Sequence, residues 1–406
     1  MKILMTAMLA ATLLSQAALA YAKQMIVGFK AEVSASDRSA ALKRMGLKFV
    51  EALPEIDAVV AETSDFRMAM ADLSLAASAE SAVTGMEENE VRNWLQGDMV
   101  AFQAVPLPAF GEVMASLPKM AKAKAAELPP LPPGVSKEEI PWGIQRVNAP
   151  NAWAKTKGEG VKVAVIDTGI DFNHPDLKSN YAGCYNAINS KASCMDDNGH
   201  GSHVSGTIAG ALDGKGVAGV APKARLYAVK VLDGDGSGGL VGIIKGIVWA
   251  GNNGIQVANM SLGAPIGTIF MRAAVKYATL RGTTIVAAAG NNGGRVGCPA
   301  CYGDAIAVSA SDSSDRIASF SSRGSDVDFI APGVDVKSSV PGGGYDWYDG
   351  TSMASPHVAG LAALAVARGA KGPAGVRAAL KGAAKSIGLK PQEQGAGLVD
   401  AATLVK

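Results

Sequence analysis

Residues 161–167 read VKVAVID, and they begin a series of apolar runs that continues with 224–232 (ARLYAVKVL), 254–262 (GIQVANMSL), 283–291 (TTIVAAAGN) and 305–311 (AIAVSAS). The runs are rich in Val, Ile and Ala and lack polar alternation, which is typical of strands buried on both faces. Segments with helical spacing separate some of these runs. Strands that alternate with helices predict an α/β fold, in which helices flank a doubly wound, mostly parallel sheet.

Glycine and charge divide the chain into two parts. Of the 48 glycines in the 406 residues, 6 lie in the first 136 residues and 42 in the remainder. The first part has 12 basic and 15 acidic side chains, a net charge of −3, and the second has 26 and 21, a net charge of +5. Two parts of opposite charge should attract each other. The overall charge of +2 and the 18% of charged residues disfavour a disordered chain or a charge-driven nucleic-acid binder.

Three segments precede the glycine-rich part. Residues 1–22 have one Lys, an apolar run and a small-residue pattern at the end, which is typical of a secretory signal peptide. The apolar run is shorter than the ~20 residues of a membrane span, so an exported protein, extracellular or periplasmic, is expected rather than an anchored one. Residues 23–97 predict a small α+β domain. Residues 98–136 are rich in Pro and predict an extended linker to a domain at 137–406.

The four cysteines all lie in the glycine-rich part. An exported protein meets an oxidising environment, where an even number of cysteines favours disulfides. Of three possible sets of pairings, we expect the one with the shortest loops, Cys184 with Cys194 and Cys298 with Cys301. A zinc site made of all four is disfavoured by the wide spacing of Cys184 and Cys194. A redox role for Cys298 and Cys301 stays open, although no redox-type βαβ pattern precedes them.

Three polar residues stand at positions that favour chemistry. Asp167 ends the first apolar run, and ligands of open parallel sheets bind beyond the carboxyl ends of the strands. His200 begins a glycine-rich helical segment, and Ser352 begins a small-residue helix whose free amides would favour an oxyanion. Each alone has a structural interpretation, as a helix cap, a packed histidine or a packing residue. Together they supply a carboxylate, a general base and a nucleophile.

Five segments resemble the signature segments of the subtilisin-like serine proteases, the subtilase family, in the family's order and spacing. They are 163–170 (VAVIDTGI), 200–207 (HGSHVSGT), 259–263 (NMSLG), 287–291 (AAAGN) and 350–360 (GTSMASPHVAG). The resemblance begins near Ile140 and extends through the rest of the sequence. Residues 24 to about 95 resemble the family's inhibitory propeptide more weakly, through MIVGFK and VTGMEENEV.

The resemblance implies a serine endopeptidase of the EC 3.4.21 class. Matched motif by motif, the catalytic residues fall on Asp167, His200 and Ser352, and the oxyanion amide falls on Asn291. His200 would take the Ser352 proton during attack on a peptide carbonyl, while Asp167 holds the imidazole. His203, one turn beyond the predicted base, is expected to be a packed structural residue.

The resemblance also implies a substrate cleft. A peptide would lie as an added strand between Gly236-Ser237-Gly238 and Ser261-Leu262-Gly263, held by main-chain hydrogen bonds that tolerate many sequences. The pocket for the residue before the scissile bond would be formed by 261–263 and Ala288-Ala289-Gly290, with Gly297 near its floor. These small, uncharged residues predict a preference for large apolar or aromatic side chains. The cysteine loop at 298–301 departs from the commoner family pattern and leaves the depth of the pocket open.

Calcium is the ion that the resemblance implies. Carboxylates and loop carbonyls are suitable hard oxygen donors for it. The candidate ligands are Glu138, Asp176, Asp213, Ala211, Lys215 and Val217. Solvated aspartates in a glycine-rich turn are the alternative interpretation.

The sequence thus predicts a secreted zymogen, in which residues 23–97 assist folding and block the site. We expect the enzyme to cut itself between about Asn93 and Ser136, and to act as a monomer on proteins or peptides, without nucleic acid or a membrane anchor. A catalytically silent peptide-binding protein on the same fold is the alternative, and it is disfavoured because no member of the triad is missing. The released N-terminal domain could also act as a separate inhibitor.

Overall fold

The computed structural model of the chain describes residues 23–63, 70–95, 125–133 and 139–406. The predicted signal peptide and most of the predicted linker lie outside the described residues. The chain forms two compact units, and the boundary between them lies between Glu90 and Val91. The predicted N-terminal domain ends later, at residue 97. The difference arises because residues after Glu90 pair as a strand with the second unit.

The first unit is a four-stranded antiparallel sheet in the order β2-β3-β1-β4, with two helices on one face. Alternate residues of β1, Met25, Val27 and Phe29, pack against Leu42 of α2 and Leu73 of α3, so one face of the sheet forms the core. The elements are β1 (Gln24–Phe29), α2 (Ala35–Arg44), β2 (Leu47–Leu53), the 3-10 helix η1 (Pro54–Ile56), β3 (Ala58–Thr63), α3 (Met70–Ala79) and β4 (Val83–Glu88).

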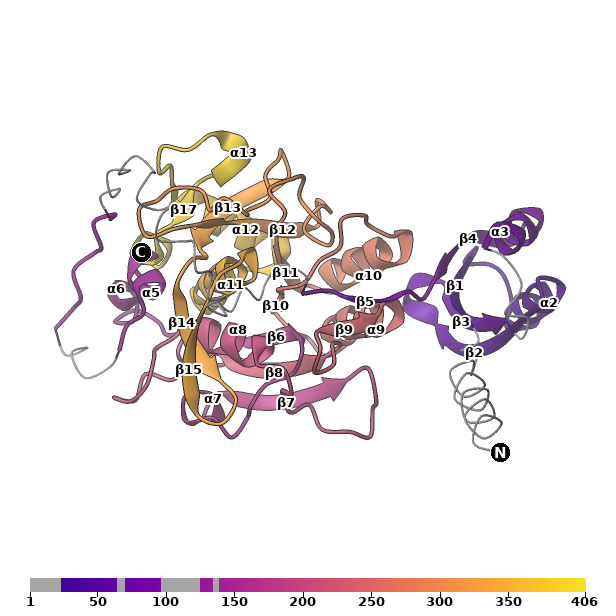
Figure 1. Ribbon diagram of the computed structural model, residues 1–406, viewed down its shortest axis with the longest axis horizontal. Coiled ribbons are helices and arrows are strands. Elements are labelled where there is room, and N and C mark those ends of the chain that lie inside the picture. Colours follow the sequence, from indigo (N-terminus) through magenta and orange to yellow (C-terminus); the bar gives the residue numbers. More distant parts are fainter. Residues whose placement is uncertain (1–22, 64–69, 96–124, 134–138) are drawn as a thin grey trace, which may run out of the picture. The chain divides into compact units, whose positions relative to one another are not determined.

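The second unit contains a nine-stranded sheet in the order β16-β17-β13-β12-β11-β10-β6-β8-β7, parallel except for β16 (Figure 1). This sheet confirms the predicted α/β class. Its strands are β6 (Lys162–Asp167), β7 (Tyr181–Asn186), β8 (Arg225–Lys230), β10 (Val257–Met260), β11 (Thr284–Ala288), β12 (Ala305–Ser311), β13 (Val327–Pro332), β16 (Ala384–Lys385) and β17 (Leu398–Val399). Two short pairs lie outside it: β5 (Val91–Asn93) with β9 (Ser237–Gly239), and β14 (Val336–Val340) with β15 (Gly344–Tyr348).

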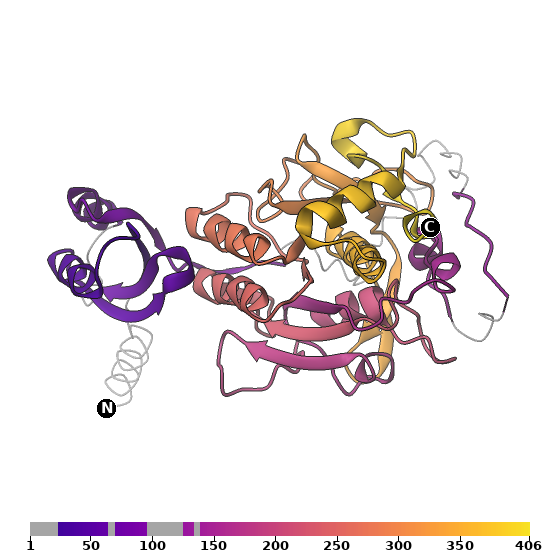
Figure 2. The same ribbon diagram turned by 180° about the vertical axis from the view of Figure 1, so that it is seen from behind.

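Helices cover both faces of the large sheet, as the views from opposite sides show (Figures 1 and 2). Val163 and Val165 of β6 share a core with α8 and α11, whereas Ile166 and Val229 point toward Gly246 of α9 on the other face. The helices are α5 (Trp142–Arg146), α6 (Ala149–Ala152), α7 (Pro175–Lys178), α8 (His200–Ala209), α9 (Leu240–Asn252), α10 (Ile269–Leu280), α11 (Thr351–Ala367), α12 (Gly372–Ala383), α13 (Pro391–Gln394) and α14 (Ala401–Leu404).

Strand order positions the predicted site. After β6 the chain builds β7 and β8 on one side of that strand and then crosses to β10 on its other side. Such a reversal of strand order opens a crevice at the carboxyl ends of the strands. Asp167 is the last residue of β6 and therefore lies at this point. Among the described helices, none combines the length and the apolar character that crossing a bilayer requires.

Candidate active site

Asp167 and His200 form a buried pair. The Nδ1 of His200 lies 2.8 Å from Oδ1 of Asp167, and both side chains are fully buried. Oδ1 also accepts a hydrogen bond from the backbone N–H of Thr168 at 2.7 Å, which fixes the carboxylate. A strand end and a helix start thus bring together two residues that are far apart in the sequence, as the motifs predict.

Glycine allows this close approach of α8 to the end of β6. A Cβ added at Gly201 would lie 2.1 Å from the carbonyl oxygen of Gly169, a distance that no side chain tolerates. Gly201 also donates its backbone N–H to Oγ1 of Thr168 at 2.9 Å. The glycine after His200 therefore sets the distance between the helix and the strand that carries Asp167.

Asp196 holds the loop in front of His200, a role that sequence reasoning missed. Its Oδ1 accepts from Thr168 Oγ1 at 2.8 Å and from the backbone N–H of Gly199 at 2.9 Å, and its Oδ2 accepts from the N–H and hydroxyl of Ser202. The side chain is 4% exposed. An Asp followed closely by Gly and a helix is typical of a side chain that caps a turn, and this pattern could have indicated it.

Ser352 lies at the start of α11 and is fully buried. Its hydroxyl donates to the carbonyl oxygen of Ser261 at 3.2 Å, and the hydroxyl of Ser261 donates to the carbonyl of Ser352 at 2.7 Å. Asn259 of β10 accepts from Ser355 at 2.8 Å and donates to Ser261 at 2.9 Å. These bonds fix the start of α11 against the end of β10.

Asn291 follows β11 and faces the same helix start. Its Oδ1 accepts from both the backbone N–H and the hydroxyl of Thr351, each at 2.8 Å. The side-chain oxygen is therefore occupied, and the amide Nδ2 is the group that remains for a ligand. This orientation suits a donor to an oxyanion beside Ser352.

The other histidines are structural. Burial lowers the pKa of His203 to about 3, and its Nε2 lies 2.9 Å from the carbonyl of Val336. Burial likewise lowers the pKa of His357 to about 4, and its Nδ1 lies 2.8 Å from the carbonyl of Met353. Nδ1 of His174 accepts a hydrogen bond from the backbone N–H of Asp176 at the start of α7. The sequence-based interpretation of His203 as a packed residue agrees with this geometry.

A strand of the same chain lies between the predicted substrate segments. β5 pairs antiparallel with β9, and the N–H of Trp94 donates to the carbonyl of Gly236 at 3.0 Å. On the other side, the N–H of Gly263 donates to the carbonyl of Trp94 at 3.3 Å. The indole N–H of Trp94 donates to Gly238 at 2.8 Å, and the residue is only 3% exposed. Leu95 is also buried and packs on Gly236.

The predicted pocket wall consists of small residues held by backbone hydrogen bonds. Ala288 and Ala289 are buried, and the N–H of Gly290 donates to Oγ1 of Thr351 at 3.0 Å. Gly297 donates to the carbonyl of Ala289 at 2.9 Å. Cys298 is bonded to Cys301, and Cys298 exchanges two backbone hydrogen bonds with Ala264, so the cystine loop lies directly beside the segment 261–263.

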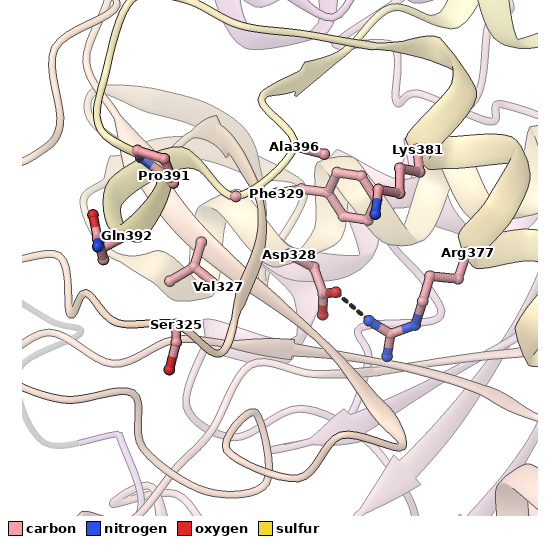
Figure 3. A pocket seen from close by; sticks show the side chains of 10 residues that line it. Ser325, Val327, Asp328, Phe329, Arg377, Lys381, Pro391, Gln392 and Ala396 are labelled. Carbon is pink, nitrogen blue, oxygen red and sulfur yellow. Dashed lines mark hydrogen bonds and ion pairs between the residues drawn. The ribbon is translucent and has the colours of Figure 1, made fainter.

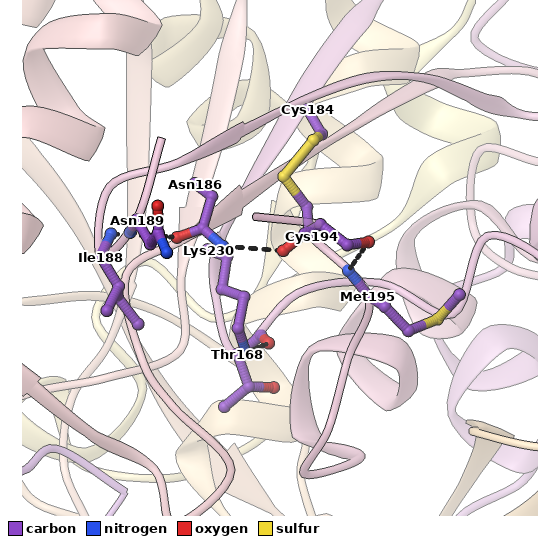
Figure 4. The surroundings of a disulfide bond; sticks show 9 residues. Thr168, Cys184, Asn186, Ile188, Asn189, Cys194, Met195 and Lys230 are labelled. Carbon is purple, nitrogen blue, oxygen red and sulfur yellow. Dashed lines mark hydrogen bonds between the residues drawn. A yellow bond between two sulfur atoms is a disulfide. The ribbon is translucent and has the colours of Figure 1, made fainter. Parts of the chain in front are cut away.

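The second disulfide joins Cys184 of β7 to Cys194, in the loop that leads to His200 (Figure 4). Lys230 lies close by at the end of β8 and is 6% exposed. Its ammonium donates to the carbonyl of Thr168 and to Asp197 Oδ1 at 2.6 Å. The disulfide connects the loop before His200 to the edge strand β7, and the lysine connects it to the end of β8 and to Thr168.

The candidate calcium ligands are only partly brought together. Asp176 is buried, and its carboxylate accepts from the N–H of Val217 at 2.9 Å and from the hydroxyl of Tyr345 at 3.1 Å. Burial and the nearby charge of Asp213 raise the pKa of Asp176. Within the described ranges, no three His, Cys, Asp or Glu side chains gather as a metal site. Glu138 lies outside the described residues, whereas Ala211 lies beside Asp176, because its backbone N–H donates to the Asp176 carbonyl at 2.9 Å.

A separate cavity of about 530 Å³ lies between β13, α12 and the segment around α13 (Figure 3). None of the predicted site residues lines it. Asp328 and Arg377 form an ion pair across it, and Arg377 also donates to the carbonyls of Gly303 and Ala305. The pair joins α12 to β13, and Lys381 of α12 adds a second basic side chain to the lining.

Comparisons with known proteins agree with this geometry. The model of the subtilase family matches residues 158–397. Subtilisin Savinase of Lederbergia lenta is 49% identical over 267 residues, which is 65% of this chain and 98% of that protein. An alkaline protease of Alkalihalobacillus alcalophilus is 49% identical, and the match covers 65% of this chain and 69% of that protein. Subtilisin E of Bacillus subtilis strain 168 is also 49% identical, and the match covers 57% of this chain and 62% of that protein. The chain belongs to the subtilase family and is a serine endopeptidase with an Asp/His/Ser-type catalytic architecture.

Proposed function

We propose that Asp167, His200 and Ser352 are the triad of this endopeptidase and that Asn291 donates to the oxyanion. The observation that carries the proposal is the buried contact of 2.8 Å between Nδ1 of His200 and Oδ1 of Asp167. It holds the imidazole so that Nε2 accepts the Ser352 proton as Oγ attacks the substrate carbonyl. The carboxylate then stabilises the imidazolium, which returns its proton to the leaving amine. Water attacks the acyl-enzyme in the second half of the reaction.

Ser352→Ala tests this assignment. The variant should lose peptide hydrolysis, while peptide binding survives because the cleft is made of main-chain groups. Ser319→Ala is a matched control, since Ser319 is an exposed serine of the same unit. Normal hydrolysis by the Ser352 variant would remove this residue from the mechanism.

We also propose that the chain is a zymogen that processes itself. Support comes from β5, because residues 91–95 lie between the two predicted substrate segments and form the hydrogen bonds of an added strand. A chain bound in this way both blocks the cleft and presents its next bonds to the nucleophile. Cleavage then falls just after Leu95, within the range of about Asn93 to Ser136. A purified Ser352→Ala chain should stay full length, and processing of that variant at the normal bond would mean that another protease acts.

The proposed specificity is broad, with an apolar or aromatic side chain before the scissile bond. It is supported by the small, uncharged pocket wall and by the burial of Trp94 and Leu95 in the cleft. Mass spectrometry of peptides released from a protein mixture tests this preference. Cleavage mainly after basic or acidic residues would contradict it.

A structural calcium site at Asp176 and Asp213 is a further part of the proposal. The two carboxylates are close enough for the charge of Asp213 to raise the pKa of Asp176, and a cation between them would relieve that repulsion. The bonds from Val217 and Tyr345 leave each carboxylate oxygen a second acceptor position. Calcium there would stabilise the fold without taking part in the reaction. Export through the signal-like residues 1–22 completes the proposed function, and N-terminal sequencing of the exported protein tests it.

A further inference from the structure

The Pro-rich segment 125–133 lies on the surface of the second unit, although the sequence predicts only a linker. Figure 1 shows it beside α5 and α6. Ala126, Pro129 and Pro132 are half-buried, whereas the residues between them are exposed. A burial period of three is that of a polyproline II helix with one face against a surface.

Side-chain amides on the unit meet the carbonyls of this segment. Nε2 of Gln145, in α5, donates to the carbonyl of Pro129 at 2.7 Å, and Nδ2 of Asn151, in α6, donates to that of Pro130 at 3.0 Å. Proline has no N–H, and a polyproline II helix forms no internal hydrogen bonds, so its carbonyls are free to accept. Amide donors are therefore the groups that such a segment needs.

The surface that binds this segment consists of α5, α6 and the loop 312–316, and an ion pair joins α5 to that loop. The N–H of Ala126 donates to the carbonyl of Ser313 at 2.8 Å, so the loop 312–316 forms the other side of the contact. Arg146 of α5 binds both carboxylate oxygens of Asp315 in that loop, at 2.9 and 2.7 Å, and both side chains are mostly buried. We call α5, α6 and the loop 312–316 the proline platform.

We propose that the proline platform keeps residues 125–133 bound after maturation, so that the mature enzyme carries a pinned N-terminal extension. The proposal rests on the proposed self-processing, because cleavage just after Leu95 leaves the segment covalently joined to the catalytic unit. The occupant of the platform is thus the chain's own Pro-rich segment. The extension stays bound to the platform when the cleaved propeptide dissociates.

The first experiment is the intact mass of the mature wild-type enzyme. The expected N-terminus lies between residues 96 and 125, and an N-terminus beyond Pro133 would overturn the proposal. A wild-type chain that stays full length would instead overturn the proposed self-processing.

The second experiment tests the platform on the full-length Ser352→Ala chain, where no self-digestion interferes. A glutamate-specific protease is used to cut at Glu127, which is exposed within the segment. Replacing Gln145 and Asn151 together by Ala should raise the rate of this cut about tenfold, since two hydrogen bonds are lost. Gln392→Ala, at an exposed position elsewhere on the unit, should leave the rate unchanged.

Equal cutting rates in the parent and the double variant would show that the platform does not hold the segment. Gln145→Glu covers the case in which the double variant fails to fold. Its side chain has the same size but cannot donate to Pro129 when ionised, so it should raise the rate several-fold on its own. An unchanged rate in this variant would also overturn the proposal.

Discussion

Trp94 should provide most of the affinity of the chain's own strand for the cleft. Its side chain is 3% exposed, and its indole N–H donates to Gly238 at 2.8 Å. A buried Trp removes roughly 150–250 Å² from water, which at about 25 cal/mol per Å² gives at most roughly 4–6 kcal/mol. Ordering the peptide offsets part of this gain. We expect a net contribution of about 3 kcal/mol, or roughly 100-fold in affinity.

The assay is competition between a peptide of residues 89–95 and a chromogenic substrate of the mature enzyme. Replacing Trp94 by Ala should raise the inhibition constant roughly 100-fold. Replacing it by Phe should raise the constant less, by about tenfold, because the hydrogen bond to Gly238 and part of the buried ring area are lost. Val91→Ala is the matched control, since Val91 is 69% exposed and its loss should change little. Equal inhibition constants for Trp, Phe and Ala would refute the role given to this side chain.

Three other predictions concern catalysis and stability. Asn291→Leu should lower turnover by roughly 10²- to 10³-fold with little change in substrate binding, a magnitude established for subtilisin itself; unchanged turnover would exclude Asn291 from the site. Because the folded-state pKa of His357 is lowered to about 4, the unfolded chain binds more protons between pH 4 and 6.5. His357 should therefore contribute about 3 kcal/mol to the fall in stability as the pH drops through this range, in addition to the contribution of His203, and His357→Gln should reduce the slope measured by urea unfolding. Removing calcium with a chelator should lower the melting temperature by roughly 5 °C in the wild type and not in Asp176→Asn; no change in the wild type would count against the site.

Much of the second unit could be predicted because its central strands are buried on both faces. Continuous apolar runs give β6, β8, β10, β11 and β12, and the motifs at their ends give Asp167 and Asn291. The edge strand β7 and the hairpin β14-β15 were not predicted, since half-exposed strands mix polar and apolar residues. In the first unit, β2 was missed for the same reason, because most of its residues are exposed or half-buried.

The parts of the site that sequence could not give depend on contacts between distant residues. Sequence can indicate that Asp196 caps a turn, but the hydrogen bonds of its carboxylate with Thr168 and Ser202 are visible only once α8 packs on β6. The proline platform depends on two single amides, Gln145 and Asn151, that no local pattern distinguishes from ordinary surface residues. Sequence identifies chemistry carried by motifs, whereas the fold reveals the groups that orient it.

The burial of α11 affects how well the enzyme resists digestion by other molecules of the same protease. Every residue from Thr351 to Ala365 is buried, so the helix that carries Ser352 cannot loosen without disrupting the layers around it. Regions of this kind open only when the whole unit opens. A neighbouring molecule can therefore cut within this helix only after complete unfolding, and the slow rate of that event sets how long the helix that carries the nucleophile stays intact.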